Sequence, residues 1–174
     1  ALTRILRMRQ RVELAKCVEI LNLLTDYRAE GYSVCVFVNF DASIEALRDR
    51  IKEPCSIIRG GQKPSERAIE VENFQRNAHR VILCNIAAGG VGISLHDEHG
   101  GHPRASIISP SYNEKEYHQV LGRIDRAGAK TASLQRVLVA AGTVEEKIIE
   151  AITCKLRNLS ALHQVEPVAP SPTI

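Results

Sequence analysis

Short apolar runs alternate with amphipathic stretches from residue 34 onward. The runs are three to six residues long and rich in β-branched side chains, a pattern typical of parallel strands buried on both faces. They span residues 34–38, 56–58, 81–84, 105–108 and 134–139. Because helical patterns separate these runs, the sequence predicts an α/β fold with an open, mainly parallel sheet and helices on both faces.

The first two helices are predicted on either side of the first apolar run. Residues 3–28 have the spacing of one long helix that Gly31 ends, and a second helix is expected to open at Asp41 or Ser43 and to reach Arg50. A third helix is expected to open at Pro64, with a buried side formed by Ala68, Ile69 and Phe74.

The last helix is predicted to follow Thr143 and Glu146, which have the spacing of a capping box. Its apolar positions can all face one way, and they are Val144, Ile148, Ile152, Leu156 and Leu159. The proline-rich residues 165–174 are typical of a tail or linker, and the chain opens without Met. We therefore expect a piece of a longer protein, with a helix at 1–30, an α/β domain at 31–164 and a tail at 165–174.

The segment 111–126 carries the most informative chemistry. Ser111 and Glu114 have the spacing of a capping box that would start a helix near Tyr112. On that helix Gln119, Arg123 and Arg126 share about 60° of arc. The other side of the helix is apolar, with Tyr117, Val120, Leu121 and Ile124. Two permanent cations on one edge suit phosphate binding, and a solvated basic stripe is the alternative.

Bulk properties limit the class of protein. The 174 residues, 44% hydrophobic and 25% charged, suit one ordered globular domain, and a net charge of +3 means that any basic surface must be local. Five scattered cysteines without a C-x-x-C pair favour a reduced intracellular compartment, whether nuclear, cytoplasmic or viral. No apolar run is long enough to cross a bilayer, so a membrane is not an expected partner.

Ligands of open parallel sheets bind at the carboxyl ends of the strands. The loops there carry Asn39-Phe-Asp41, the glycine turn 85–92 and the entry to the arginine helix. Glycines at 89, 90 and 92 would let a phosphate approach backbone N–H groups, although such a turn can also serve chain geometry alone. No phosphate loop of the G-x-x-x-x-G-K-[ST] type is present, so we do not expect this chain to hydrolyse a nucleotide unaided.

No metal site is predicted. Asp97-Glu-His99 is similar to a magnesium-binding box, and His96, His99 and His102 with Asp97 could ligate zinc. However, these residues stand among Gly100, Gly101 and Pro103 without a further cluster of ligands, so a polar loop is the favoured interpretation.

Five segments in order resemble the second RecA-like lobe of superfamily-two helicases and translocases, above all the Swi/Snf-type branch. They are Val34 to Phe40 (motif IV), Gly60-Gly-Gln-Lys-Pro-Ser-Glu-Arg67, Asn85-Ile-Ala-Ala-Gly-Gly-Val-Gly-Ile-Ser-Leu95 (motif V), Gln119-x-x-Gly-Arg-x-x-Arg126 (motif VI) and Thr143-Val-Glu-Glu-Lys-Ile148. The resemblance covers about residues 34–156. Gly122 departs from the Asp that the Swi/Snf branch commonly has, which leaves strand separation and duplex translocation both open.

The resemblance implies roles for particular residues. ATP with Mg²⁺ would bind between this lobe and an upstream lobe that holds the metal, with Arg123 and Arg126 at the γ-phosphate and Gln119 positioning Arg123 or a water. Gly92 and Ser94 would line the nucleotide. The expected nucleic-acid contacts, with DNA favoured over RNA, are Asn39, Phe40, Asn85, Ala88, Gly89 and Gly90. Arg67 could contact a phosphate, or it could be an exposed or ion-paired arginine of a helix.

Two other classes of protein remain as alternatives. One is a catalytically idle RecA-like module that binds nucleic acid or a protein partner. The other is a small phosphate-binding α/β enzyme complete in itself. The two motif VI arginines favour the motor over the idle module. The absence of a nucleophile, base and metal constellation argues against the self-contained enzyme.

Overall fold

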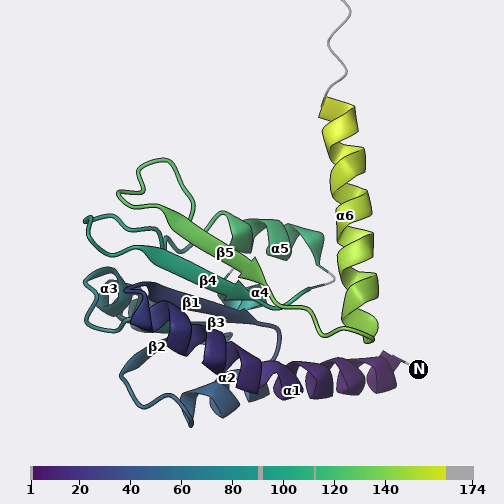
Figure 1. Ribbon diagram of the computed structural model, residues 1–174, viewed down its shortest axis with the longest axis horizontal. Coiled ribbons are helices and arrows are strands. Elements are labelled where there is room, and N and C mark those ends of the chain that lie inside the picture. The colour runs from purple at the N-terminus through teal and green to yellow at the C-terminus, as the bar shows by residue number, and fades with distance from the viewer. Residues whose placement is uncertain (1, 90–91, 112, 164–174) are drawn as a thin grey trace, which may run out of the picture.

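The computed structural model describes residues 2–89, 92–111 and 113–163, and a five-stranded parallel sheet lies at its centre (Figure 1). The strand order is β2-β3-β1-β4-β5, and every pairing is parallel. The strands are β1 (Ser33–Val38), β2 (Cys55–Ile58), β3 (Val81–Asn85), β4 (Arg104–Ile108) and β5 (Ser133–Val137). The predicted open parallel sheet is confirmed.

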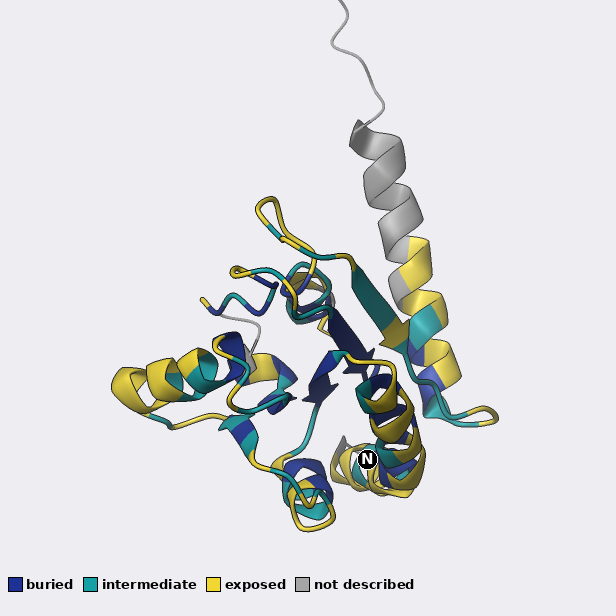
Figure 2. Cartoon of the chain, turned by 60° about the vertical axis from the view of Figure 1, so that its left-hand side comes forward, coloured by how far each residue is buried: buried dark blue, intermediate teal, exposed yellow. Residues whose placement is uncertain are grey.

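Helices cover both faces of this sheet, as predicted. They are α1 (Leu2–Ala29), α2 (Asp41–Arg48), α3 (Pro64–Gln75), α4 (Ile86–Gly89), α5 (Glu114–Leu121) and α6 (Val144–His163). One apolar cluster joins α1 and α2 to one face, and a second joins α3, α4, α5 and the start of α6 to the other. The central strands are buried, and the edge strand β5 is only half-buried (Figure 2).

Strand β1 shows why the apolar runs are continuous rather than alternating. Val34, Val36 and Val38 belong to the cluster under α1 and α2, whereas Cys35 and Phe37 belong to the opposite cluster. Because side chains alternate between the two faces of a strand, a sheet covered on both faces needs apolar residues at every position.

Helix α1 is longer than the sheet that it covers. Its 28 residues extend about 42 Å, whereas six-residue β1 extends about 20 Å. A short turn at Gly31 (φ +95°) reverses the chain between them, so the N-terminal half of α1 projects beyond the carboxyl edge of the sheet (Figure 1). Glu13, near the middle of α1, is level with Asn39 at the end of β1.

The arginine helix is shorter than predicted at both ends. Asn113, not Ser111, is the N-cap of α5, and its side chain accepts the N–H of Glu116. The Ser111 hydroxyl instead accepts the N–H of Asn113, so the predicted capping box with Glu114 is wrong. The helix ends at Leu121 with Gly122 as C-cap, because glycine is a poor interior helix residue.

The buried side of α3 was only partly predicted. Phe74 is fully buried, but Ala68 is exposed and 61% of the Ile69 surface is accessible. Periodicity gave a helix, but the face that carries Ala68 meets an open cleft rather than a covering element.

Helix α6 begins where predicted, but Thr143 and Glu146 bond to other N–H groups than those of a capping box. The Thr143 hydroxyl accepts the N–H of Glu145, and the Glu146 carboxylate accepts the N–H of Gly142. On the predicted apolar face Ile148 is buried and Val144 half-buried. The side chains of Ile152, Leu156 and Leu159 and the residues of the expected tail lie outside the described part. No described helix is both long and apolar enough to span a membrane.

Candidate nucleotide and nucleic-acid site

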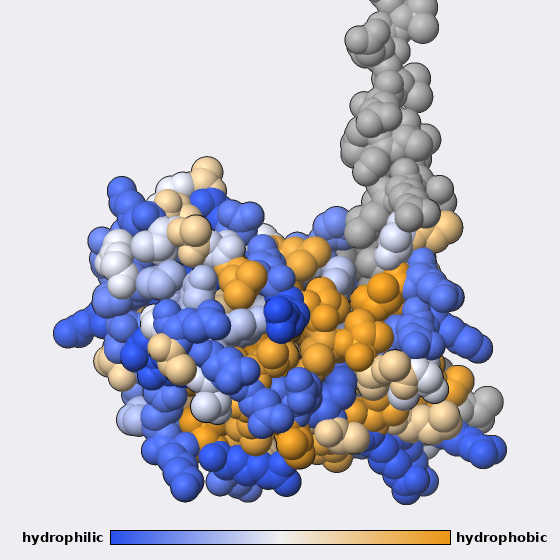
Figure 3. Space-filling model, in the orientation of Figure 1, coloured by the Kyte–Doolittle hydropathy of each residue, from blue (hydrophilic) through white to orange (hydrophobic). Residues whose placement is uncertain are grey.

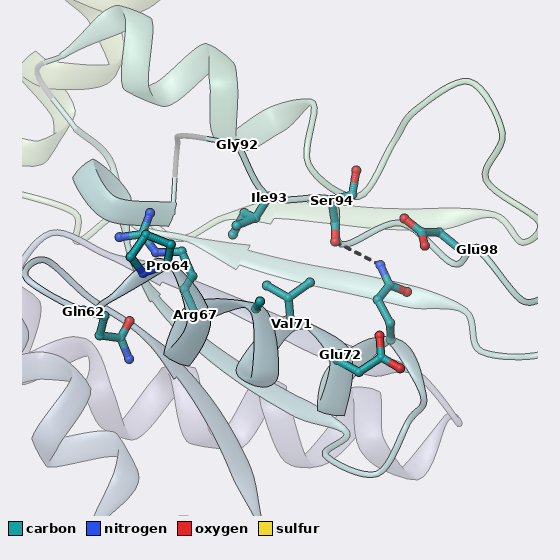
Figure 4. A pocket seen from close by; sticks show the side chains of 11 residues that line it. Gln62, Pro64, Arg67, Val71, Glu72, Gly92, Ile93, Ser94 and Glu98 are labelled. Carbon is teal, nitrogen blue, oxygen red and sulfur yellow. Dashed lines mark hydrogen bonds between the residues drawn. The ribbon is translucent and has the colours of Figure 1, made fainter.

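A cleft of about 630 Å³, which we call the α3 cleft, runs between α3 and residues 92–98 (Figure 4). One face of α3 forms its first wall with Pro64, Arg67, Ala68, Val71, Glu72 and Gln75. These positions recur every three or four residues, so they share one side of the helix. Gln62, Gly92, Ile93, Ser94 and Glu98 complete the lining.

The second wall of the cleft is held by hydrogen bonds to two distant elements. Gln75 donates from Nε2 to the carbonyl oxygens of Ser94 (2.9 Å) and His96 (3.1 Å). The Leu95 N–H donates to the carbonyl of Arg123 at 3.0 Å. These bonds fix an irregular segment that begins at Gly92, whose φ of +71° favours glycine.

Both motif VI arginines contact this segment, although they follow α5 rather than lie on it. Arg123 Nη1 donates to the Ile93 carbonyl at 2.9 Å, and Arg126 Nη1 donates to Ser94 Oγ at 3.0 Å. Arg126 Nε also donates to the Gly122 carbonyl at 3.0 Å. The structure therefore brings Gly92, Ser94, Arg123 and Arg126 together.

The two arginines differ in exposure. Arg123 is 6% exposed and Arg126 is exposed. Burial lowers the pKa of Arg123, and the charge of Arg126 lowers it further. The prediction that Gln119 shares one helix face with the two arginines is wrong, because Gln119 lies exposed on α5 and both arginines follow the end of that helix. The reason is that the backbone leaves the helix at Gly122, before either arginine.

A second hollow of about 450 Å³, which we call the edge pocket, lies at the carboxyl ends of β1, β2 and β3. Its lining residues are Asp41, Gly60, Arg67, Asn85, Ala87 and Ala88. Arg67 lines both the α3 cleft and the edge pocket. Within the described residues no carboxylate pairs with Arg67, and its buried Nε has no hydrogen-bond partner.

The residues predicted to contact nucleic acid fall into three groups. Asn85 and Ala88 line the edge pocket, and Gly89 ends α4. Asn39 and Phe40 are both half-buried. The side-chain amide of Asn39 donates to the Glu13 carboxylate (2.7 Å) and to the Pro110 carbonyl (2.9 Å). The Arg9 guanidinium lies over the Phe40 ring. Gly90 lies outside the described residues.

Sequence reasoning missed Glu13. Its carboxylate, 1% exposed, accepts from the backbone of Asn39 and Phe40 and from the Ser43 hydroxyl. The available signal was a carboxylate among the core-facing positions of an amphipathic helix, since Cys17 and Ile20 share that face.

Asp97 organises the polar loop that follows the cleft. Its carboxylate accepts the N–H groups of Gly100 (2.9 Å) and His102 (3.0 Å) and the Thr131 hydroxyl (3.0 Å). Burial acts to raise the pKa of Asp97, but these hydrogen bonds outweigh it and the pKa is lowered. In the described part of the chain no group of three or more His, Cys, Asp or Glu side chains is placed to hold a metal ion.

The sheet order and the meeting of a glycine turn with two arginines define a RecA-like lobe. The family described as "Helicase conserved C-terminal domain" matches residues 15–128. The chain therefore belongs to the helicase C-terminal domain family of superfamily two, as the resemblance predicted.

Relatives of known name are viral and cellular. The chain is 38% identical over 163 residues to the "Putative ATP-dependent RNA helicase L364" of Acanthamoeba polyphaga mimivirus, covering 93% of this chain and 30% of the relative. It is 30% identical over 141 residues to the human "DNA excision repair protein ERCC-6-like", covering 78% of this chain and 11% of the relative. The chain thus spans less than a third of either relative.

A solved structure shares the fold. The C-terminal part of the Fun30 ATPase domain superposes with a TM-score of 0.66 at 20% identity, over 77% of this chain and 44% of that one.

A third relative supports the Swi/Snf-type character of the chain. It is the human "SWI/SNF-related matrix-associated actin-dependent regulator of chromatin subfamily A member 1", which is 28% identical over 149 residues. The match covers 82% of this chain and 14% of the relative.

Proposed function

We propose that this chain is the C-terminal motor lobe of an ATP-dependent nucleic-acid helicase or translocase. The observation that supports the proposal most directly is the contact of Arg123 and Arg126 with consecutive residues, Ile93 and Ser94, beside the glycine turn. Two cations bonded to the segment that lines one wall of the α3 cleft, in a chain of this family, suit a site for the terminal phosphates of ATP.

The arginine site fits ATP on electrostatic grounds. The charge of Arg126 contributes to the lowered pKa of Arg123, so the two guanidiniums repel each other, and a polyanion between them relieves that repulsion. Gly92 adds no side chain, and open space surrounds the position of its missing Cβ, so a ligand can approach the backbone. Ser94 then lies beside the nucleotide, as the resemblance implies.

In this proposal the arginines act when the γ-phosphoryl group is transferred to water. Charge spreads over its oxygens, and rigid donors aimed at them lower the barrier. Arg123 is held by the Ile93 carbonyl and supplies a fixed donor, whereas exposed Arg126 can reach across to the closing lobe. Gln119 positions Arg123 or a phosphate-bound water. The upstream lobe of the same protein holds Mg²⁺ and closes the site.

The edge pocket and the loops around it form the proposed nucleic-acid surface. Arg67 offers a cationic group to phosphates from the lining of the edge pocket, which also includes Asn85 and Ala88. Asn39, Phe40, Gly89 and Gly90 are the further proposed contacts. Contacts to the phosphate backbone carry no sequence preference. We expect DNA to be the better substrate because two of the three relatives named above are named for DNA repair or chromatin.

The test is ATPase activity of the full-length protein with single-stranded DNA, duplex DNA and RNA compared. Stimulation by nucleic acid is expected, and removing an arginine finger lowers kcat by roughly 10³-fold or more. We expect Arg123→Ala and Arg126→Ala together to abolish turnover while ATP still binds, with exposed Arg76→Ala as the matched control. Turnover that survives the double substitution contradicts the proposal, and an inactive wild type favours the idle module.

A further inference from the structure

A buried carboxylate of α1, that of Glu13, contacts two residues of the proposed nucleic-acid surface, Asn39 and Phe40. Glu13 Oε1 accepts the Phe40 N–H at 3.0 Å and the Ser43 hydroxyl at 2.8 Å. Oε2 accepts the Asn39 N–H at 2.9 Å and the Asn39 side-chain amide at 2.7 Å. Phe40 is the N-cap of α2, so Glu13 accepts from another helix an N–H at the start of α2 that has no partner within the helix.

The bonds continue from Asn39 to two other strand ends. The second N–H of the Asn39 amide donates to the Pro110 carbonyl, just after β4, at 2.9 Å. Asn85, at the end of β3, donates to Asp41 Oδ1 at 2.8 Å and to the Asn39 carbonyl at 3.4 Å. Asn85 Oδ1 in turn accepts the N–H of Ala87 inside α4 at 3.0 Å. One connected network therefore joins α1, β1, β3 and α4.

Packing alone does not account for a carboxylate at position 13. The neighbouring core positions of α1, Cys17 and Ile20, are satisfied by apolar side chains, and a buried charge is costly unless hydrogen bonds compensate it. The carboxylate instead satisfies four donors from residues 39, 40 and 43 at once, which fixes the direction in which the loop after β1 leaves the sheet.

We propose that Glu13 is a positioning residue for nucleic-acid binding: from α1 it orients Asn39, Phe40 and, through Asn39, Asn85. This inference rests on the proposed function, since the residues that it orients are the expected nucleic-acid contacts. Glu13 itself touches neither nucleotide nor nucleic acid. Its loss therefore affects the response to nucleic acid and leaves ATP hydrolysis without nucleic acid intact.

The test is Glu13→Gln in the full-length protein. Glutamine keeps the size of the side chain, but an amide NH₂ group replaces one of the two carboxylate oxygens. Because this group donates and does not accept, at least one hydrogen bond from Asn39 or Phe40 is lost. We expect the DNA concentration for half-maximal ATPase stimulation to rise by roughly fivefold or more, the range of a coupling between two sites. Basal turnover and the KM for ATP are expected to stay unchanged.

Two control variants separate positioning from stability. Glu19→Gln changes an exposed carboxylate of the same helix and should alter nothing. Ser43→Ala removes one bond to Glu13 at the start of α2 but keeps both bonds to Asn39; it should lower the melting temperature without moving the half-stimulating DNA concentration. If Glu13→Gln does not melt cooperatively, Glu13→Asp takes its place, with the charge kept and the reach shortened.

The outcomes are distinct. A rise in half-stimulating concentration with unchanged basal turnover supports the proposal. An unchanged concentration in a folded Glu13 variant overturns it, as does a parallel fall of basal and stimulated turnover, which indicates a structural role only. A wild-type protein that hydrolyses ATP without any response to nucleic acid contradicts the proposed function first, independently of Glu13.

Discussion

The buried ion pair between Lys16 and Glu145 gives a prediction that can be worked out from its surroundings. Lys16 Nζ lies 2.6 Å from Glu145 Oε1 and also donates to Ser109 Oγ (3.3 Å) and the Leu138 carbonyl (3.0 Å). Glu145 Oε2 accepts the N–H of Ala140 at 2.9 Å. The pair thus joins α1 to the first turn of α6 and to the ends of β4 and β5. Figure 3 shows hydrophobic side chains gathered on the face of the molecule between the sheet and α6.

The expected magnitude follows from burial. The two side chains are only 7% and 5% exposed, so solvent hardly screens the charges. Removing one partner of a buried pair leaves an uncompensated charge and costs about 3–5 kcal/mol. We expect Lys16→Met and Glu145→Gln each to lower the free energy of unfolding by about 3 kcal/mol. The double variant keeps an acceptor for Ala140 and has no charge left over, so it should lose at least ~2 kcal/mol less than the sum.

The assay is urea unfolding of the four proteins of this double-mutant cycle, followed by far-ultraviolet circular dichroism. The exposed pair Arg48–Glu45 gives a control cycle with Arg48→Met and Glu45→Gln, because its side chains are 47% and 38% exposed. Its coupling energy should stay below about 1 kcal/mol. The reasoning is refuted if the buried pair couples no more strongly than this exposed pair.

Two further predictions concern the segment beside the α3 cleft. The folded pKa of Asp97 is lowered, so its stabilisation is present above the unfolded value and is lost as pH falls through the folded value. The difference in urea midpoint between wild type and Asp97→Asn should therefore be constant near neutrality and shrink below about pH 4; a constant difference down to pH 3 contradicts this. A Cβ added at Gly92 meets no atom within 4 Å, but the backbone there has a φ of +71°. Gly92→Ala should therefore lower the free energy of unfolding by about 1 kcal/mol, from backbone strain alone. Gly60 also lies in open space but has no positive φ, so Gly60→Ala should lower the free energy of unfolding by less. Equal losses in the two variants would contradict the strain argument.

The strands could be predicted because a strand that is covered on both faces is apolar at every position, and this pattern is visible in the local sequence. Val34 to Val38 are apolar at every position, and the structure shows each buried, three under α1 and α2 and two under the opposite helices. The helices were equally predictable from spacing, except the short α4 (Ile86–Gly89), which lies in the segment predicted as a glycine turn. The parallel arrangement followed from the alternation of the two patterns, since parallel neighbours need a crossover between them.

Helix ends and helix faces were harder to predict because they depend on partners elsewhere in the chain. The arginine segment keeps a helical pattern through residue 126, yet the helix ends at Leu121, and Arg123 bonds to a carbonyl 30 residues away. Ile69 has the spacing of a core residue but no element covers it among those described. Periodicity reports which residues share a side, not what faces that side.

The charged core positions were missed for the same reason. The local sequence around Glu13 and Lys16 does not identify their partners, which lie 26 to 129 positions further along the chain. Only the folded arrangement shows that α1 runs past the carboxyl edge of the sheet and brings both charges to the strand ends.

The order of the contacts along residues 85–95 suggests how the two proposed sites communicate. At one end Asn85 is held by the edge network that begins at Glu13, and its side chain also accepts from α4. At the other end Ile93 and Ser94 are held by the two arginines. Both anchors lie on one covalent segment of ten residues, so a displacement of one anchor has a short route to the other along the chain. In the proposed motor, a rearrangement at the arginines can therefore act on the nucleic-acid surface along the covalent segment that joins the two anchors.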